Sequence, residues 1–424
     1  MSPISWLSAC VFASSLAGMP AWAQPSALPD APRAVLPASS EPAAGGLTLG
    51  AALDAAWQRA VAARESDGQR RRAEADRAVA GSFWAGPPSL EMSLRDDRFQ
   101  SNAGNRETDV GVAVPLWMPG QRAARAGAAD AAAAQARATE QVARLRLAGE
   151  LRESAWHLAA LQAEAAQVDS QARTLRQLAE DVERRVRAGD LARADALAAQ
   201  GEYLGASALQ ADVRQRLEAA RARWTLLTGL ASMPDPTSAA FDTAAPGAVP
   251  HPEMHLAGQS AELARRRVDL MRLSRRDAPE LTFGVRQEVP GRNEASQGSL
   301  VVGLRLPFAT EDRNRPLEAA AIGELDVAQT REQRLHERLD SDVASARAAQ
   351  RAAEAGLDAM TARAGLLRER AALIGKSFRA GETPLPDLLR ALASEAQADS
   401  AVARQTAALG LARARLQQAL GLLP

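Results

Sequence analysis

The sequence contains one stretch twice, in copies that lie 192 residues apart. Residues 186–199 read Val-Arg-Ala-Gly-Asp-Leu-Ala-Arg-Ala-Asp-Ala-Leu-Ala-Ala, and residues 378–391 read Phe-Arg-Ala-Gly-Glu-Thr-Pro-Leu-Pro-Asp-Leu-Leu-Arg-Ala. The offset superposes Gly189 on Gly381 and Asp195 on Asp387 without a gap. The second half of the chain is therefore expected to repeat the fold of the first half, which predicts a pseudo-symmetric structure.

Each copy predicts a tight turn between two helices. In the second copy, Gly381 suits a left-handed helix C-cap, Thr383 an N-cap and Pro384 the first position of the next helix. Asp387 then falls in the first turns of the outgoing helix. Gly189 predicts the same turn in the first copy.

Long helices lead into both turns. From about residue 122 to 187 no Pro interrupts the pattern, and at 1.5 Å per residue this segment would extend roughly 100 Å. Two stripes of residues seven apart run along it, one of Leu161, Val168, Leu175 and Val182 and one of Leu158, Ala165, Ala172, Ala179 and Val186. The second half repeats the pattern with Leu339, Ala346, Ala353, Met360, Leu367 and Ile374, and with Leu357, Ala364, Ala371 and Phe378. Two stripes on one helix predict packing partners on two sides, as in a ring or sheet of coiled coils.

The composition agrees with long helices rather than with large globular cores. Only 4% of the residues are aromatic, while Ala, Leu, Arg, Glu and Gln dominate. The 51 basic residues are balanced by 51 acidic ones. This balance gives no indication of nucleic-acid binding, which requires a basic face.

Alternating apolar and polar residues predict two β-hairpins, one in each half. Leu90, Met92 and Leu94 alternate with polar residues, and the same pattern recurs in three further segments. We expect strands at about residues 89–97, 107–117, 279–289 and 297–308. Pro115 and Pro307 mark the ends of ladder pairing. Helices at about residues 47–80 and 253–276 precede the hairpins.

The hairpins are the candidate membrane-crossing elements. No run outside the N-terminus reaches the 18 or more apolar residues typical of a spanning helix. Four strands cannot close a membrane barrel, because the smallest such barrels use eight. Several chains must therefore pool their hairpins, and the residues alone leave open whether these are two or three. Trp84 and Trp117, with Phe83 and Phe308, are placed at one end of the strands, where an interfacial aromatic belt and the barrel–tunnel junction are expected. The alternative is a soluble sandwich hairpin, which would leave such strands attached to very long helices.

The N-terminus resembles a targeting segment. Residues 4–18 are apolar, and Ala21-Trp22-Ala23 resembles a cleavage site, so residues 1–23 are interpreted as a signal peptide. The residues before Cys10 also resemble a lipoprotein cleavage box, which leaves lipidation as an alternative. We expect a flexible tail at residues 24–46, repeat 1 at 47–230, a Pro-rich linker at 231–250 and repeat 2 at 251–424.

The duplicated order of helix, hairpin, very long helix, turn and helix resembles the TolC-type outer-membrane efflux proteins. The resemblance covers essentially all of residues 47–423. In the second turn it rests on Phe378, Gly381, Asp387, Leu388 and Leu389. Residues 88–91, 107–111, 115–116 and 120–125 are most similar to the heavy-metal cation branch, whose components are CzcC-like and CusC-like.

This resemblance implies a mainly α-helical protein with a membrane β-barrel. The family is a homotrimer, with a twelve-stranded barrel in the outer membrane and an α-helical coiled-coil tunnel in the periplasm. A periplasmic adaptor (a membrane fusion protein) and a proton-driven inner-membrane RND-type pump complete the export path. The resemblance places the chain in the outer membrane of a Gram-negative-type cell and makes it the exit duct for heavy-metal cations.

The resemblance also implies where the channel narrows. Asp387 matches the aperture aspartate of the family, and a ring of carboxylates there would bind cations and respond to salt. Arg390 replaces a second aspartate found in some members and offers Asp387 a charge partner. Phe378 and Thr383 replace the gate Tyr and Arg of well-known members. Asp195 is the weaker candidate in repeat 1. The alternative for both aspartates is an exposed side chain favoured by the helix dipole.

No motif predicts catalysis or a bound cofactor. The chain has four His and one Cys, and lacks a nucleophile elbow, a phosphate loop and a zinc-enzyme motif. His251 and His255 are four residues apart without further ligands, so they are interpreted as solvated polar sequence rather than as a metal site. Two other functions remain open at this point: a duct for drugs or for type I protein secretion, and a coiled-coil scaffold of the cell envelope that transports nothing.

Overall fold

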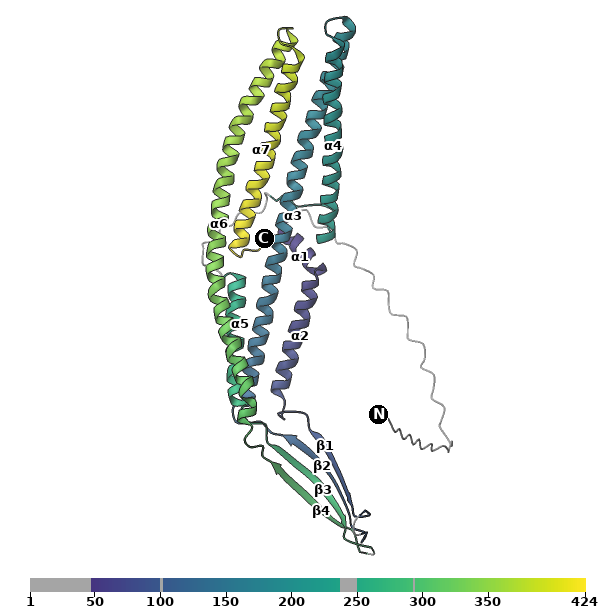
Figure 1. The fold of residues 1–424 in the computed structure, drawn as a ribbon, viewed down its shortest axis with the longest axis vertical. Helices are drawn as coiled ribbons and strands as arrows, with labels where there is room; N and C mark the ends of the chain where they lie inside the picture. Colours follow the sequence, from purple (N-terminus) through teal and green to yellow (C-terminus); the bar gives the residue numbers. More distant parts are fainter. Residues whose placement is uncertain (1–46, 100–101, 237–249, 293) are drawn as a thin grey trace, which may run out of the picture. The chain divides into compact units, whose positions relative to one another are not determined.

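The computed structural model describes residues 47–99, 102–236, 250–292 and 294–424. The signal peptide, Cys10, the N-terminal tail and most of the predicted linker lie outside these residues. The described chain runs twice through helix, hairpin, long helix and returning helix (Figure 1). The elements of repeat 1 are α1 (Leu49–Arg59), α2 (Val61–Gly81), β1 (Ser89–Asp96), β2 (Arg106–Pro115), α3 (Gln121–Ala188) and α4 (Arg193–Thr228). Those of repeat 2 are α5 (Pro252–Leu273), β3 (Glu280–Val289), β4 (Gln297–Arg305), α6 (Glu311–Arg379) and α7 (Leu385–Ala419).

The two long helices contain 68 residues in α3 and 69 in α6. Helix α3 packs against α4 and α7 along its C-terminal half, and against α1, α2 and α5 elsewhere. Helix α6 packs against α5 and α7. All of the Leu and Val residues predicted for the first α3 stripe are buried, as are Leu158, Ala165, Ala172 and Ala179 of the second. The heptad pattern thus accounts for the packing of α3 on two sides.

The helix predicted for residues 47–80 is interrupted. Ala60 has an extended backbone, with φ −68° and ψ 137°, and it separates α1 from α2. Leu53 of α1 is buried in a cluster with residues of α3 and α4, and the guanidinium of Arg144 from α3 lies over the ring of Trp57, whereas α2 lies along α3. A single extended residue allows the chain to change direction between these two packing sites, and no Gly or Pro marks it in the sequence.

The four strands form one antiparallel sheet in the order β1-β2-β3-β4, so the two predicted hairpins join through β2 and β3. The ladders end at Pro115 and Arg305, two and three residues before the predicted ends at 117 and 308. After Pro115 the chain leaves the ladder, although Leu116 N still donates to Pro279 O at 2.8 Å.

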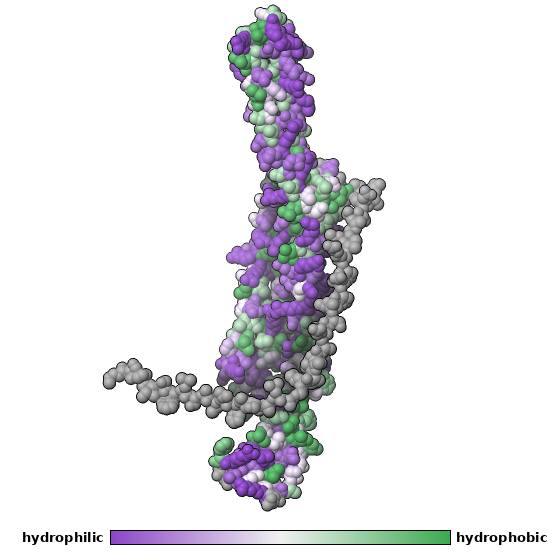
Figure 2. All heavy atoms as spheres, turned by 90° about the vertical axis from the view of Figure 1, so that its right-hand side faces the viewer, coloured by the Kyte–Doolittle hydropathy of each residue, from purple (hydrophilic) through white to green (hydrophobic). Residues whose placement is uncertain are grey.

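The two faces of the sheet differ in polarity. On one face, apolar residues of the four strands lie in register with their side chains exposed. One such row consists of Leu90, Val112, Phe283 and Val302. Figure 2 shows apolar side chains gathered on the sheet next to the helices, while polar ones cover much of the helical tips. On the other face Arg286 lies 2.7 Å from Asp109 and 2.7 Å from Glu107. The alternation read from the sequence therefore produces one apolar face and one ion-paired face.

A buried arginine joins the two repeats near the middle of α3. Arg152 is 3% exposed and donates to Gln418 Oε1 and to the Leu422 carbonyl, both at 2.8 Å. Burial lowers the pKa of Arg152 to about 10. Because the helix dipole makes the C-terminal end of α7 negative, the guanidinium is stabilised there without a carboxylate partner.

Gly410 allows α7 to pack closely on α3. A Cβ atom at Gly410 would lie 2.1 Å from ring carbons of Trp156. We expect Gly410→Ala to lower the free energy of unfolding by about 1–3 kcal/mol, because the ring or the helix must move. Gly68 is the matched control, since a Cβ atom there would meet no other atom within 4 Å; Gly68→Ala should be neutral or stabilise α2 by about 0.5–1 kcal/mol. Thermal unfolding followed by circular dichroism measures both, and equal midpoints for wild type and Gly410→Ala would contradict the packing.

Candidate functional site

The turn of repeat 2 is closed by Gly381, as the sequence predicts, but the next helix begins later than predicted. Gly381 has φ +81°, and the Glu382 amide donates to the Ser377 carbonyl at 3.0 Å. Pro384, not Thr383, is the N-cap of α7, with an extended backbone. The Thr383 hydroxyl is engaged elsewhere, 2.6 Å from Ser377 Oγ. The prediction of Thr383 as the N-cap was wrong because this hydroxyl bonds back to the end of α6.

Asp195 and Asp387 occupy the same position in their helices and have different partners. In repeat 1 the Asp195 carboxylate accepts from the N-cap amide of Ala192 at 3.2 Å. In repeat 2 the N-cap is Pro384, which has no amide hydrogen. Asp387 instead lies 2.8 Å from Arg390 Nη2. Because Pro384 offers no amide, Asp387 forms an exposed ion pair where the equivalent Asp195 caps its helix. The Arg390 side chain of this pair is 77% exposed.

The turn between α3 and α4 and the turn between α6 and α7, here called the two tips, meet in an apolar cluster. Its buried members come from both helical hairpins and are Ala179, Val182, Ala199, Phe378, Leu385 and Leu388. Phe378 is 4% exposed, so its ring is packed inside the tip. The Arg185 guanidinium lies over its ring, 5.2 Å from the centroid. The outer end of the seam, which is the interface between the α3–α4 and α6–α7 helical hairpins, is therefore apolar, with the Arg185 guanidinium at its edge.

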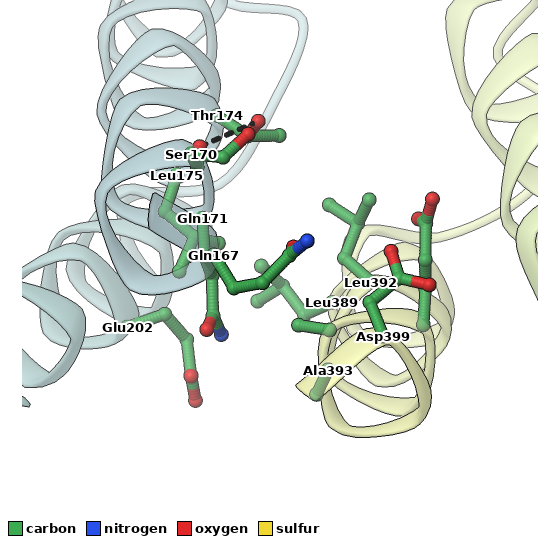
Figure 3. A pocket seen from close by; sticks show the side chains of 12 residues that line it. Gln167, Ser170, Gln171, Thr174, Leu175, Glu202, Leu389, Leu392, Ala393 and Asp399 are labelled. Carbon is green, nitrogen blue, oxygen red and sulfur yellow. Dashed lines mark hydrogen bonds between the residues drawn. The ribbon is translucent and has the colours of Figure 1, made fainter. Parts of the chain in front are cut away.

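Further along the same seam the hairpins border a polar groove (Figure 3). Gln167, Gln171 and Thr174 of α3 line one side, and Glu395 and Asp399 of α7 line the other. Burial raises the pKa of Glu395, and the charge of Asp399 raises it further, while Arg368 opposes both. Asp399 is paired with Arg368 of α6 at 2.8 Å. Glu395 is thus the carboxylate of this groove whose charged form is disfavoured.

The residues predicted for the barrel–tunnel junction lie where the sheet meets the helices. Trp117 Nε1 donates to the Ser82 carbonyl at 3.2 Å, and the Ala85 amide donates to the Pro115 carbonyl at 3.1 Å. The ring of Trp84 contacts that of Phe83 edge-on, with centroids 4.5 Å apart. Pro307 lies with the exposed Phe308 at the end of β4. These contacts fix the segments that connect α2 to β1 and β2 to α3.

The described residues contain neither a metal cluster nor a helix that could span a bilayer. No group of three or more His, Cys, Asp or Glu side chains in this part of the chain is arranged to hold a metal ion. Among the described helices, none is both long and apolar enough to cross a membrane. His251 caps α5, because its Nδ1 accepts from the Glu253 amide at 3.1 Å.

Comparison with known proteins links this geometry to one family. No protein-family model matches the chain. The cobalt-zinc-cadmium resistance protein CzcC of Cupriavidus metallidurans is 27% identical over 315 residues, which is 71% of this chain and 72% of that protein. The crystal structure of CusC superposes with a TM-score of 0.72 at 15% identity, covering 88% of this chain and 92% of that one.

The outer-membrane protein VceC of Vibrio cholerae gives a TM-score of 0.69 at 16% identity, covering 88% of this chain and 96% of that one. The chain has the fold of the TolC-type outer-membrane efflux proteins. The resemblance predicted from the sequence is thereby confirmed, and the sequence similarity to CzcC agrees with the heavy-metal branch. These TolC-type relatives are channel proteins rather than enzymes.

Three polar residues of the tip region escaped the sequence analysis: Arg185, Ser377 and Glu395. Arg185 and Ser377 are 192 residues apart, so the duplication aligns a cation with a hydroxyl. This mismatch could have been noticed in the sequence, because different residues at equivalent positions indicate that the two positions make different contacts. Glu395 carries no comparable signal, since its burial depends on the packing of α7 beside α3.

The raised pKa of Glu395 predicts a pH-dependent effect on stability. The folded-state pKa lies above the unfolded value of 4.5, so the fold favours the protonated form, and stability is lost as the pH rises through the folded pKa. Glu395→Gln should therefore unfold at a higher temperature than wild type at neutral pH, with no difference below the unfolded pKa.

Glu354→Gln is a control that should change the stability in the opposite direction. Gln350 and Arg413 lower the pKa of Glu354, so its charge stabilises the fold above the unfolded pKa of 4.5 and this contribution disappears as the pH falls. The variant should unfold earlier than wild type at neutral pH. Melting curves across the pH range measure both variants, and a pH-independent difference for Glu395→Gln would contradict the burial of its carboxyl group.

Proposed function

We propose that the chain is the outer-membrane exit duct of a tripartite, proton-driven efflux system that exports heavy-metal cations. The observation that carries the proposal is the duplicated helix–hairpin–helix fold, which superposes on outer-membrane channels over nearly nine-tenths of the chain. Sequence similarity to a cobalt-zinc-cadmium resistance protein supports the cargo. The chain resides in the outer membrane.

The apolar face of the sheet supports membrane insertion. Leu300 is 84% exposed and Val302 67%, far more than isolated surface residues require. The outer strands β1 and β4 each have one partner in the described sheet, and unpaired strand edges are untenable in lipid. Pairing β4 of one copy with β1 of the next would complete these ladders. Three copies give the twelve-stranded barrel of the family.

The helices support closure by identical copies as well. Helix α3 is covered by both α4 and α7, but its counterpart α6 is covered in this region by α7. Accordingly, Met360 of α6 is exposed, whereas the equivalent Val168 of α3 is buried. On α4, Leu197 and Leu204 are exposed at the positions equivalent to Leu389 and Ala396, which line the α3–α7 seam. Helix α4 of a second copy thus supplies the partner that α6 lacks, and repetition generates a ring.

The duct operates with two further components. A periplasmic adaptor connects it to an inner-membrane RND-type pump, which couples export to proton entry. Transported cations are cargo, so the duct requires no tight metal site. The polar face of the sheet, with Arg286 held between Asp109 and Glu107, faces the watery lumen.

The proposed constriction lies at the tip, with Asp387, Arg390 and Asp195 as its charged residues. The Asp387–Arg390 pair is exposed, so it contributes about 0–1 kcal/mol and is screened by salt. A weak, screened pair suits a site that cations must enter and leave. Asp195 is committed to its helix cap, which makes it the lesser contributor.

Substitution in this pair tests the constriction. We expect Asp387→Ala or Arg390→Ala to raise the single-channel conductance of the trimer in planar bilayers or to change its block by cations, most clearly at low salt. Asp195→Ala is the matched control at the equivalent helix position. It should lower the free energy of unfolding by about 1 kcal/mol through the lost cap, with a smaller change in conductance. Unchanged conductance in both repeat 2 variants would place the constriction elsewhere.

A deletion strain tests the cargo. Loss of the chain should lower the inhibitory concentrations of cobalt, zinc, cadmium, copper or silver salts, and the wild-type gene should restore them. Antibiotics and bile-type detergents are tested in parallel. Drug sensitivity without a metal phenotype would favour a drug-efflux duct, and a secretion defect would favour a type I duct. A purified protein that forms no channel would instead favour an envelope scaffold.

A further inference from the structure

The junction between the sheet and the helices is charged differently in the two repeats. In repeat 2, carboxylates face the arginines of this junction. Arg276 lies 2.8 Å from Glu311, and Arg275 lies 2.7 Å from Glu318. The positive charges of the repeat 2 junction are therefore balanced by neighbouring negative ones.

The junction of repeat 1 keeps two arginines without such a partner. Arg122 and Arg125 lie in the first turns of α3, and neither meets a carboxylate within the described chain. The Arg122 guanidinium donates to the Gly81 carbonyl at 2.7 Å, and that of Arg125 lies 5.8 Å from the ring centroid of Trp117. In repeat 2 the residue equivalent to Arg122 is the uncharged Asn314. Because the two arginines are three residues apart on one helix, they lie on the same side of it.

A surface groove between α2 and α3 runs beside Arg122. Three charged residues, Arg77, Arg122 and Asp130, line it, and its other lining residues are Ala and Gly. Asp130 lies 3.2 Å from Arg77, so these two charges compensate each other. Arg122 leaves the groove with a net positive charge, and the small side chains around it give an anion access to the guanidinium.

Aromatic rings at the same junction suit the boundary of a bilayer. Phe83 is 74% exposed and contacts Trp84 edge-on, and apolar side chains gather on the sheet next to the helices (Figure 2). The 10 residues of β2 extend roughly 33 Å at about 3.3 Å per residue. A tilt of about 40° reduces this to roughly 25 Å, the height of the apolar band of a membrane barrel. The first turns of α3 then lie at the level of the lipid headgroups.

We propose that Arg122 and Arg125 bind the phosphate group of an anionic phospholipid in the membrane leaflet next to the helices, while Phe83 inserts among the adjoining acyl chains. A guanidinium offers two parallel N–H donors to phosphate oxygens and keeps its charge at every physiological pH. The inference rests on the insertion of the sheet into the membrane, as proposed above, and is independent of the cargo. The charge balance of the repeat 2 junction confines the site to repeat 1.

Lipid titration of the purified full chain in detergent tests the site. Native mass spectrometry measures the binding of dioleoyl-phosphatidylglycerol and of dioleoyl-phosphatidylcholine, which share their acyl chains and differ in net charge. Wild type should bind phosphatidylglycerol more tightly. Arg122→Gln and Arg125→Gln should each weaken this binding about fivefold, with little effect on phosphatidylcholine. Arg315→Gln is the matched control, because Arg315 is an exposed cation of the repeat 2 junction that pairs with Asp312, and it should keep the wild-type preference.

Two further measurements separate the headgroup contact from other effects. Arg122→Lys keeps the charge without the forked donors, so it should lose less of the preference than Arg122→Gln. Circular dichroism without lipid should give the same helical content for all variants. Inorganic phosphate at millimolar concentration should not displace the lipid, because it lacks acyl chains. Its full displacement of the lipid would identify a soluble anion as the ligand and overturn the proposal.

The remaining outcomes are equally decisive. Equal affinity of wild type for the two lipids would overturn the site, as would an unchanged preference in both Gln variants or an equal loss in Arg315→Gln. Conductance in planar bilayers tests the duct separately. A preference for phosphatidylglycerol in a protein that conducts no ions would support the lipid site and refute the channel. Conduction without the preference would support the channel and refute the lipid site.

Discussion

Two apolar stripes on one helix need two partners, and this requirement governs the helical part of the structure. Helix α3 meets it inside the chain, because α4 covers one side and α7 covers the other. Helix α6 has the same stripes, yet only α7 packs beside it along the tip half of the described chain. The duplicated chain therefore contains one complete interface, between α3 and α7, and the two unpaired surfaces of another, on α6 and α4. Burial of apolar area is the main source of stability, so the incomplete interface favours assembly with identical copies.

The sheet likewise has groups that lack partners within one chain. Its four strands pair in register across both repeats, which leaves one apolar face exposed and two outer strands with one partner each. Lipid suits the apolar face, and further strands from other copies suit the edges. The helical and β parts thus both support the closure by identical copies that we propose, through unburied apolar stripes in one and unpaired backbone groups in the other.

The tip combines strong and weak contacts. Phe378 and Leu385 are buried between the hairpins, whereas Asp387 and Arg390 lie in the solvent with a pair that salt screens. The apolar cluster joins the two helical hairpins, while Asp387 and Arg390 are charged residues of the constriction that we propose.

The duplication, most of the helices and strands, and the positions of the turns could be predicted from local periodicity and from residues such as Gly189 and Gly381. The sequence by itself also determined which faces of the strands are apolar, since alternation along a strand needs no knowledge of neighbours. The pairing of β2 with β3, the helix break at Ala60 and the contact of Arg185 with Phe378 could not be predicted, because they depend on tertiary packing. The tertiary structure also separated two aspartates at equivalent positions, because Pro384 lacks the amide that Ala192 offers. These outcomes depend on which element packs beside which, and residues that meet across a seam leave no periodic signal along the chain.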